Sequence, residues 1–241
     1  GLPGFSETMQ AKILENAKRV TERLRRFPRA ELVDDVEKLL KKVRSVQGVE
    51  RCEVAGSFRR EKETVGDIDV LVVTTSAQKV SDAIAELPIV RDVVAHGDKK
   101  LSFDMEVGTR LRSASRSSAG QVRVDIRFVR RDQWGAALLY FTGSKEHNIA
   151  LRKRAIQRGW KLNEYGLFEG EKVLASREES DIYKALGLPM VPPEKRAELL
   201  RQAAEQRGIT DSNAIDAALK RNGCAPPPLA SHLRPATEAH A

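Results

Sequence analysis

The segment from Gln121 to Val129 alternates between apolar and polar side chains. The apolar set is Val122, Val124, Ile126 and Phe128, and the polar set between them is Arg123, Asp125 and Arg127. Because successive side chains of a β-strand point to opposite faces, this alternation predicts a strand with one buried and one polar face. The β-branched run from Ile68 to Val73 predicts a second strand. The chain must therefore build a sheet, and Asp125 lies on the polar face of one strand.

Helical periodicity surrounds these strands. Apolar residues recur at helical spacing through residues 13–20, 32–43 and 133–158, with a break and an expected N-cap at Gly143-Ser144. Shorter patterns predict strands at Cys52–Ala55 and Val90–Val94, helices at Ser81–Leu87 and Glu178–Leu186, and hairpins across Lys161–Ala175. A Ser- and Arg-rich segment at residues 112–120 is expected to be a loop, and Pro192-Pro193 is expected to end the packed region. Strands interleaved with helices favour the mixed α/β class.

The chain carries more positive than negative charge. Lys and Arg number 42 against 34 Asp and Glu, a formal net charge of +8 among 241 residues. This excess favours a polyanionic partner, either nucleic acid or an anionic membrane surface. The longest stretches without a charged side chain, Gln133–Ser144 and Asn222–Leu233, are only twelve residues long, so no segment is expected to span a bilayer.

The cysteines and the first residue bear on the cellular compartment. Cys52 and Cys224 lie far apart and neither belongs to a CxxC pair, so neither a disulfide framework nor a thiolate zinc site is expected. The chain begins with Gly1 and shows no secretory leader pattern. We therefore expect part of a protein from the reducing cytoplasm.

Three aspartates on the expected strands suggest a metal site. Asp67 and Asp69 are two residues apart, so both carboxylates leave the same face of one strand, and Asp125 lies on the polar face of the other. Three carboxylates on one sheet would repel one another, and divalent cations with hard oxygen ligands, Mg²⁺ above all, relieve this repulsion. The pattern predicts a two-metal phosphoryl-transfer site. An isolated Asp-x-Asp would more often be a solvated strand edge.

A candidate phosphate-binding turn precedes the acidic pair by eleven residues. Gly56-Ser57 follows a predicted strand and opens a helix that carries Arg59 and Arg60. The glycine lets a phosphate approach the backbone, the helix start offers free N–H groups, and a guanidinium adds bidentate positive charge. Together with the aspartates across an adjacent strand, this turn would cradle a triphosphate.

These motifs resemble those of the family X DNA polymerases, and of their bacterial branch in particular. The shared segments are Gly56-Ser57-Phe58-Arg59-Arg60, Gly66-Asp67-Ile68-Asp69, Arg123-Val124-Asp125-Ile126-Arg127, Tyr140-Phe141-Thr142-Gly143-Ser144 and Asn163-Glu164-Tyr165. The resemblance runs from Arg26 to Arg196. It implies a nucleotidyltransferase palm with a mixed sheet at residues 28–131 and a small α/β thumb at residues 132–200. Residues 1–27 would be a helical remnant of the fingers region, and residues 201–241 a proline-rich tail, expected to be partly disordered.

The resemblance also implies roles for individual residues. Asp67 and Asp69 would bind two Mg²⁺ ions, for which Mn²⁺ can substitute, and Asp125 would bind the catalytic ion beside the primer 3′ hydroxyl. The residues implied in nucleotide binding are Arg26, Gly56, Ser57, Arg60, Tyr140, Phe141, Gly143 and Asn148. Those implied in DNA binding are Arg123, Lys145, Arg152 and Tyr165. By the same resemblance, the Tyr140-Phe141 pair favours template use and deoxynucleotides, because the template-independent members of the family carry Gly-Trp at these two positions.

Two departures from the family pattern limit what the resemblance implies. Lys145 stands where some members carry an acid, so its contact with the incoming base is open. A module that grips a 5′ phosphate and a His-rich phosphoesterase domain, both found in longer members, are not expected within these residues, and nuclease activity is not predicted.

The function expected from the sequence is template-directed addition of deoxynucleotides to a DNA primer, as in short gap filling during base excision repair. The expected partners are gapped or primer-template DNA and a dNTP, with no membrane, for a cytoplasmic, nucleoid-associated monomer. Two alternatives remain open: a template-independent nucleotidyltransferase with the same palm, and a DNA-binding module that is inactive as a fragment. Phosphate contacts alone would give the latter sequence-independent affinity.

Overall fold

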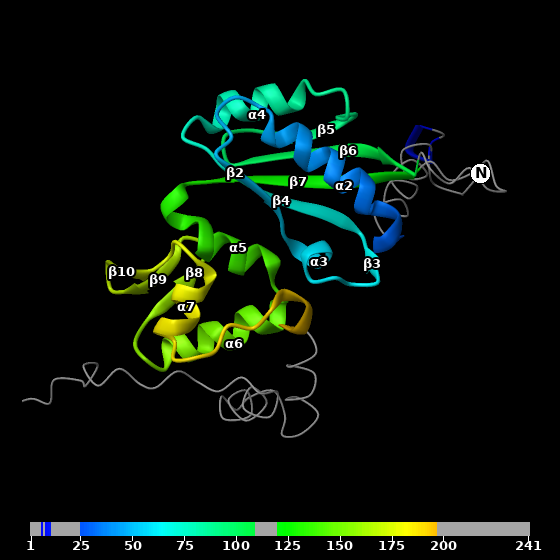
Figure 1. Ribbon diagram of the computed structural model, residues 1–241. Coiled ribbons are helices and arrows are strands. Elements are labelled where there is room, and N and C mark those ends of the chain that lie inside the picture. The colour runs from blue at the N-terminus through cyan, green and yellow to red at the C-terminus, as the bar shows by residue number, and fades with distance from the viewer. Residues whose placement is uncertain (1–5, 7, 11–24, 109–119, 197–241) are drawn as a thin grey trace, which may run out of the picture.

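A five-stranded mixed sheet is the centre of the computed structural model, which describes residues 6, 8–10, 25–108 and 120–196 (Figure 1). Its strands are β2 (Arg51–Val54), β4 (Asp67–Val73), β7 (Gly120–Val129), β6 (Lys100–Val107) and β5 (Val93–His96), in that spatial order. β4 and β7 run parallel, with Asp69 opposite Asp125, whereas the other neighbours are antiparallel. The strands predicted at Ile68–Val73 and Gln121–Val129 are confirmed.

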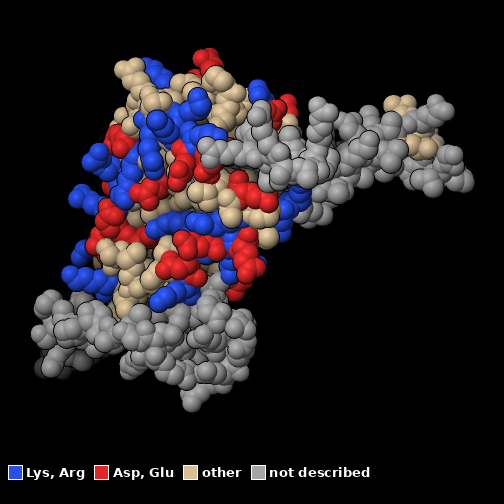
Figure 2. All heavy atoms as spheres, turned by 45° about the vertical axis from the view of Figure 1, so that its right-hand side comes forward, with Lys and Arg blue, Asp and Glu red and all other residues tan. Residues whose placement is uncertain are grey.

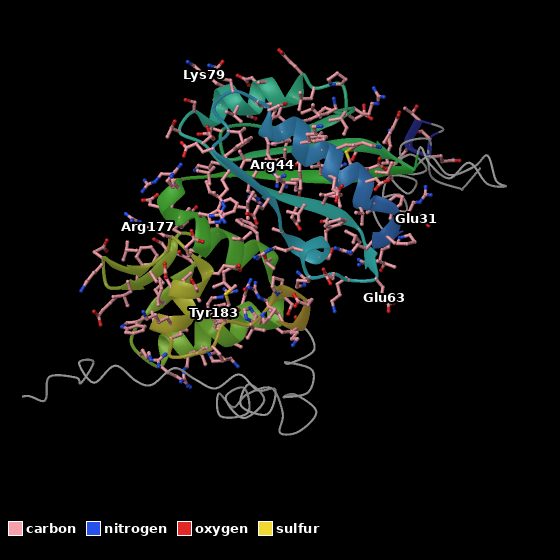
Figure 3. All side chains as sticks on the ribbon, viewed as in Figure 1. Glu31, Arg44, Glu63, Lys79, Arg177 and Tyr183 are labelled. Atoms are coloured by element: carbon pink, nitrogen blue, oxygen red, sulfur yellow. The ribbon has the colours of Figure 1, made fainter. Side chains whose placement is uncertain are left out.

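Two helices cover one face of this sheet: α2 (Arg29–Arg44) and α4 (Ala77–Ala85), as Figure 1 shows. Apolar side chains of both helices share one buried core with Ile68, Val70 and Val72 of β4, which are almost fully buried. Arg44, labelled in Figure 3, reaches from α2 to the carbonyl of Cys52 in β2. A short ladder of β1 (Phe27–Pro28) and β3 (Thr64–Val65) flanks the sheet.

The opposite face of β4 is covered along only part of its length. Leu71 and Val73 pack against Trp134 and Ala137 of α5 (Trp134–Thr142), which follows the 3₁₀ turn η1 (Arg131–Gln133). Asp67 and Asp69 share this face, because side chains two residues apart in a strand point the same way. The strand therefore presents its acids where the apolar cover of α5 ends, beside the short helix α3 (Gly56–Arg59).

A second unit follows α5 and has a core of its own. It comprises α6 (Lys145–Ile156), the antiparallel strands β8 (Lys161–Asn163), β9 (Gly166–Glu169) and β10 (Lys172–Ala175), α7 (Glu179–Ala185) and the turn η2 (Pro193–Lys195). Ser144 caps α6 by accepting a hydrogen bond from the backbone N–H of His147 at 3.4 Å. The expected break at Gly143-Ser144, the hairpins and the last helix are confirmed.

Several predicted boundaries are wrong. The helix expected at Ser81–Leu87 spans Ala77–Ala85, and the strand expected at Val90–Val94 is β5 (Val93–His96), because the N–H of Val90 closes a turn on Leu87. β6 has no counterpart among the predictions. Pro192-Pro193 does not end the packed region, since Arg196 is fully buried.

The mixed α/β class with a palm-like mixed sheet and a small α/β unit is confirmed. The helix predicted through residues 13–20, the loop at residues 112–119 and the tail from residue 201 lie outside the described residues. Among the described helices, none has the length and apolar character needed to cross a membrane.

Candidate active site

Asp67, Asp69 and Asp125 meet on the polar face of the central strands. One carboxylate oxygen from each lies within 4.8 Å of those of the other two. The parallel register sets Asp69 directly opposite Asp125, and Asp67 opposite Arg123. Three carboxylates at this spacing form the oxygen donor set that divalent cations such as Mg²⁺ or Ca²⁺ prefer, so the residues fit a divalent metal site.

The pKa of Asp69 shows that bringing the three carboxylates together is electrostatically unfavourable. Burial raises its pKa to about 7, and the charges of Asp67 and Asp125 act in the same direction. Arg127 and Arg60 oppose the rise but do not overcome it. The cluster is therefore short of positive charge, a deficit that a bound cation would relieve.

Strand β6 supplies partners for the third carboxylate. Lys100 donates from Nζ to Oδ2 of Asp125 at 2.9 Å, and Ser102 donates from Oγ to Oδ1 at 2.6 Å. Two residues further along, Asp104 accepts two hydrogen bonds from Arg123, at 2.6 and 3.2 Å. Lys100, Ser102 and Asp104 thus form one row on the same face as Asp125.

The turn into α3 lies beside the acids. Gly56 has φ of +57°, a conformation that favours glycine. Arg60, just after the helix, donates to the carbonyl of Thr142, while its Nε has no hydrogen-bond partner among the described residues. Burial lowers the pKa of Arg60, against the raising effect of Asp69. A half-buried guanidinium with an unused donor suits an anionic ligand.

A pocket of about 540 Å³ joins these elements. It is lined by Arg26, Gly56, Ser57, Arg60, Lys62, Asp67, Asp69, Tyr140, Phe141, Gly143, Lys145, Asn148 and Arg152. Its volume lies in the range of small-molecule sites, and both the acidic and the basic residues open into it. All eight residues predicted to bind nucleotide line this pocket, as do Lys145 and Arg152.

Two of the predicted DNA contacts lie outside this lining. Arg123 is held by Asp104 next to the acids, and Tyr165 lies in the turn between β8 and β9 with 52% of its surface exposed. Arg26 reaches the pocket from before β1, where its guanidinium is anchored on the hydroxyl and carbonyl of Thr64.

The aromatic pair forms the wall of the pocket that belongs to α5. The rings of Tyr140 and Phe141 meet edge to face, with centroids 5.1 Å apart. Arg152 lies over the Tyr140 ring and Arg127 over the Phe141 ring. Asn148 donates its amide N–H to the carbonyl of Tyr140 at 2.6 Å, which ties α6 to the end of α5.

A buried ion cluster connects helix α3, beside the central sheet, to the second unit. Arg59 donates to both oxygens of Glu179, at 3.0 and 2.6 Å, and to the hydroxyl of Thr142 at 2.7 Å. Arg196 donates to the same carboxylate at 2.8 Å. Burial alone would raise the pKa of Glu179, but the two guanidinium groups outweigh it and lower the pKa. The two adjacent arginines therefore have different roles: Arg60 lines the pocket, and Arg59 binds Glu179.

A second buried contact holds α7 against α6. Tyr183, labelled in Figure 3, lies between the two helices, and its hydroxyl is 2.8 Å from Nε2 of His147. Burial lowers the pKa of His147 to about 3, and the charge of Arg196 acts in the same direction. His147 is therefore a neutral structural residue at physiological pH.

The surface charges do not separate into large patches of one sign on the face drawn in Figure 2, where basic and acidic side chains alternate. Exposed ion pairs of the described residues include Arg51 with Glu178, Arg91 with Glu106 and Arg131 with Glu50. The net charge of +8 is the sum over all 241 residues, including those that the structure does not describe.

Sequence reasoning missed four residues of the site: Lys62, Lys100, Ser102 and Asp104. A signal existed for the last three, because Lys100–Val107 alternates polar residues with Leu101, Phe103, Met105 and Val107, all buried. This is the pattern that identified β7, applied to a strand that the predictions left out.

A mixed sheet that carries three clustered carboxylates beside a glycine-opened helix, with a smaller α/β unit packed against it, is the arrangement of a nucleotidyltransferase. Residues 26–130 match the family model described as DNA polymerase beta palm, and residues 137–197 match that of the DNA polymerase beta thumb. The chain belongs to the family X DNA polymerases.

Individual relatives agree with this assignment. The DNA polymerase/3'-5' exonuclease PolX of Bacillus subtilis is 33% identical over 201 residues, which cover 81% of this chain and 33% of that protein. DNA polymerase lambda of Rattus norvegicus is 31% identical over 165 residues, which cover 60% of this chain and 28% of that protein. DNA polymerase lambda of Arabidopsis thaliana is 28% identical over 196 residues, or 71% and 36% of the two chains. The chain thus spans about a third of the length of these relatives.

Proposed function

We propose that the chain adds deoxynucleotides to the 3′ end of a DNA primer under the direction of a template. The observation that carries this proposal is the aspartate triad, two members of which, Asp67 and Asp69, line a basic pocket of about 540 Å³. The names of the relatives, DNA polymerases from bacteria and eukaryotes, support it. The division into a palm at residues 28–131 and a thumb at residues 132–200 is part of the proposal, and the family matches support it.

The residues divide the work of phosphoryl transfer. Two divalent cations, proposed to be Mg²⁺, would be held by Asp67, Asp69 and Asp125, and when bound they supply charge neutralisation and activation of the primer hydroxyl. Ser57 and Arg60 bind and orient the triphosphate, with Arg26 and Lys62 adding positive charge to the same pocket. Arg123, fixed by Asp104, positions the primer end beside the triad.

Helix α5 and the second unit together contribute the wall that faces the base and sugar. Tyr140 and Phe141 exclude a ribose 2′ hydroxyl by their bulk, and Asn148 presents its amide to the minor-groove edge of the incoming nucleotide. Arg152 and Lys145 face the template side of the pocket, and Tyr165 extends this surface beyond it. We propose a monomer that fills short gaps during DNA repair in the cytoplasm, near the nucleoid.

The test is single-nucleotide extension of a labelled primer on a one-nucleotide-gapped duplex with Mg²⁺ and each dNTP in turn, compared with unannealed primer. Insertion of the complementary base alone is the expected result. Asp125→Asn should abolish insertion and leave DNA binding intact, because it removes one charged ligand and keeps the shape. Addition to unannealed primer would instead establish a template-independent transferase, and DNA binding without any addition would establish a binding module.

A further inference from the structure

We propose that Lys100 is a tethered cation on Asp125 that must leave this carboxylate when a divalent cation binds, while Ser102 holds the carboxylate in place throughout. This inference rests on the proposed function, because it assigns two positioning residues to the third carboxylate of the triad. It concerns residues of β6, a strand that lies outside the family motifs quoted above.

Lys100 and Ser102 together donate hydrogen bonds to both carboxylate oxygens of Asp125. Ser102 is directly opposite Asp125 in the antiparallel register, and Lys100 is two residues along the same face. Lys100 contacts Oδ2 at 2.9 Å, and Ser102 contacts Oδ1 at 2.6 Å. Each carboxylate oxygen of Asp125 therefore has a hydrogen-bond donor, one charged and one neutral.

The two contacts differ in what a metal ion would do to them. A divalent cation coordinated through Oδ2 of Asp125 would lie within about 5.5 Å of the ammonium, from a coordination distance of 2.0–2.6 Å added to the 2.9 Å contact of Lys100. Two cations at this distance on one carboxylate oxygen repel each other. Ser102 is neutral, and the oxygen that accepts its proton keeps a second lone pair free for a metal. Lys100 must therefore move, and Ser102 can stay.

The surroundings allow this movement. One-third of the Lys100 side chain is exposed, against 21% of Asp125, so the ammonium can turn into solvent without leaving a cavity. A lysine also has a long, flexible stem and a strongly hydrated head, which suits a group that exchanges between a carboxylate and water. Ser102, by contrast, is 98% buried, with an exposed fraction of 2%, and has no such freedom.

The exchange has a measurable consequence. Lys100 competes with the cation, so its removal should tighten metal binding to the triad in the protein without DNA or nucleotide. We expect Lys100→Met to lower the Kd for Mn²⁺ about fivefold, measured from the electron paramagnetic resonance signal of free Mn²⁺. Fivefold equals about 1 kcal/mol, at about 1.4 kcal/mol for each tenfold change in an equilibrium constant.

Matched variants separate this effect from a general loss of charge. Lys99→Met removes the same charge from the exposed residue just before β6, and it should leave the Kd unchanged. In an Asp125→Asn background, Lys100→Met should have no effect, because the two residues act on each other. Ser102→Ala should weaken Mn²⁺ binding, since the carboxylate loses its fixed contact. Far-ultraviolet circular dichroism checks folding, and Lys100→Gln replaces Lys100→Met if the latter does not fold.

The outcomes distinguish this inference from the proposed function. If Lys100→Met leaves Mn²⁺ binding unchanged or weaker while Asp125→Asn reduces it, the exchange is refuted and the metal site stands. If Asp125→Asn binds Mn²⁺ as the unaltered chain does, Asp125 is not a metal ligand, and its role in the proposed function fails together with the exchange. A Ser102→Ala variant with an unchanged Kd would refute the role of Ser102.

Discussion

The carboxylate of Asp69 lies against the backbone of Gly56, with no room for a side chain between them. A β-carbon on Gly56 would be 2.0 Å from Oδ2 of Asp69 and 2.9 Å from its Cγ. Gly56 also adopts φ of +57°, where a side chain is strained in any surroundings. The glycine that opens α3 therefore also makes the space that one carboxylate of the triad occupies.

Gly56→Ala should inactivate the protein more than it destabilises it. The new methyl group would push the Asp69 carboxylate out of the triad, and a displacement of about 1 Å at a reacting centre costs about 100-fold in rate. We expect at least this loss in single-nucleotide extension. Gly170→Ala is the control, because Gly170 has φ of +56° and open space around it, so it suffers the strain without the clash. Equal activity in the two variants would contradict this account.

Glu179→Ala should destabilise the contact between the two units. It leaves the guanidinium of Arg196, which is fully buried, and that of Arg59 without their shared carboxylate. Breaking a buried ion pair from one side costs about 3–5 kcal/mol. Urea unfolding would measure this, with Glu178→Ala as the control. Glu178 is more than half exposed and pairs with the exposed Arg51, so its loss should cost under about 1 kcal/mol.

The triad and the turn into α3 could be predicted from the sequence because local patterns specify them. Period-two alternation puts Asp67 and Asp69 on one face, and a glycine between a strand and a helix marks the turn. The neighbours of Asp125 could not be predicted, since the contact with Ser102 depends on which strand pairs with β7 and in which register. No local pattern states that pairing.

Buried charges were the other limit of sequence reasoning. Arg196 follows two prolines and resembles the start of an exposed tail, but it is fully buried against Glu179 and the ring of Tyr183. Arginine is almost never fully buried without a partner, and this partner lies 17 residues away on another element. The sequence shows both residues and cannot show that they meet.

Lys62→Ala should weaken nucleotide binding while leaving DNA affinity nearly unchanged. Lys62 is exposed at the pocket, where it adds charge beside Arg60 and Ser57. An exposed contact between opposite charges is worth up to about 1 kcal/mol, so KM for the dNTP should rise up to about fivefold. Lys79→Ala removes the same charge from α4, on the far side of the sheet in Figure 3, and should change neither quantity. An equal rise in KM for both variants would show that the effect comes from net charge and not from the position of Lys62 at the pocket.

The stability of the protein should fall as the pH drops from 6.5 toward 3, in part because of His147. Its pKa is lowered from 6.5 to about 3 in the folded protein, so between these values the unfolded chain binds a proton that the folded protein rejects. The groups that face it are Tyr183 of α7, Arg196 beyond η2 and Arg60 near the pocket, and both arginines disfavour the charged imidazole. Above pH 6.5 the residue is neutral in both states and its full contribution is present.

The expected loss between pH 8 and pH 5 is about 2 kcal/mol, from about 1.4 kcal/mol for each pH unit over which the two states differ by one proton. Urea unfolding at pH 8 and pH 5 measures it, and His147→Gln is the comparison, because glutamine keeps a polar group near Tyr183 and does not titrate. Protonation of the paired carboxylates, including Glu179, also lowers the unfolding free energy in acid, but by the same amount in both proteins. The decline in unfolding free energy should therefore be about 2 kcal/mol smaller in His147→Gln, and equal declines would show that His147 is protonated in the folded state.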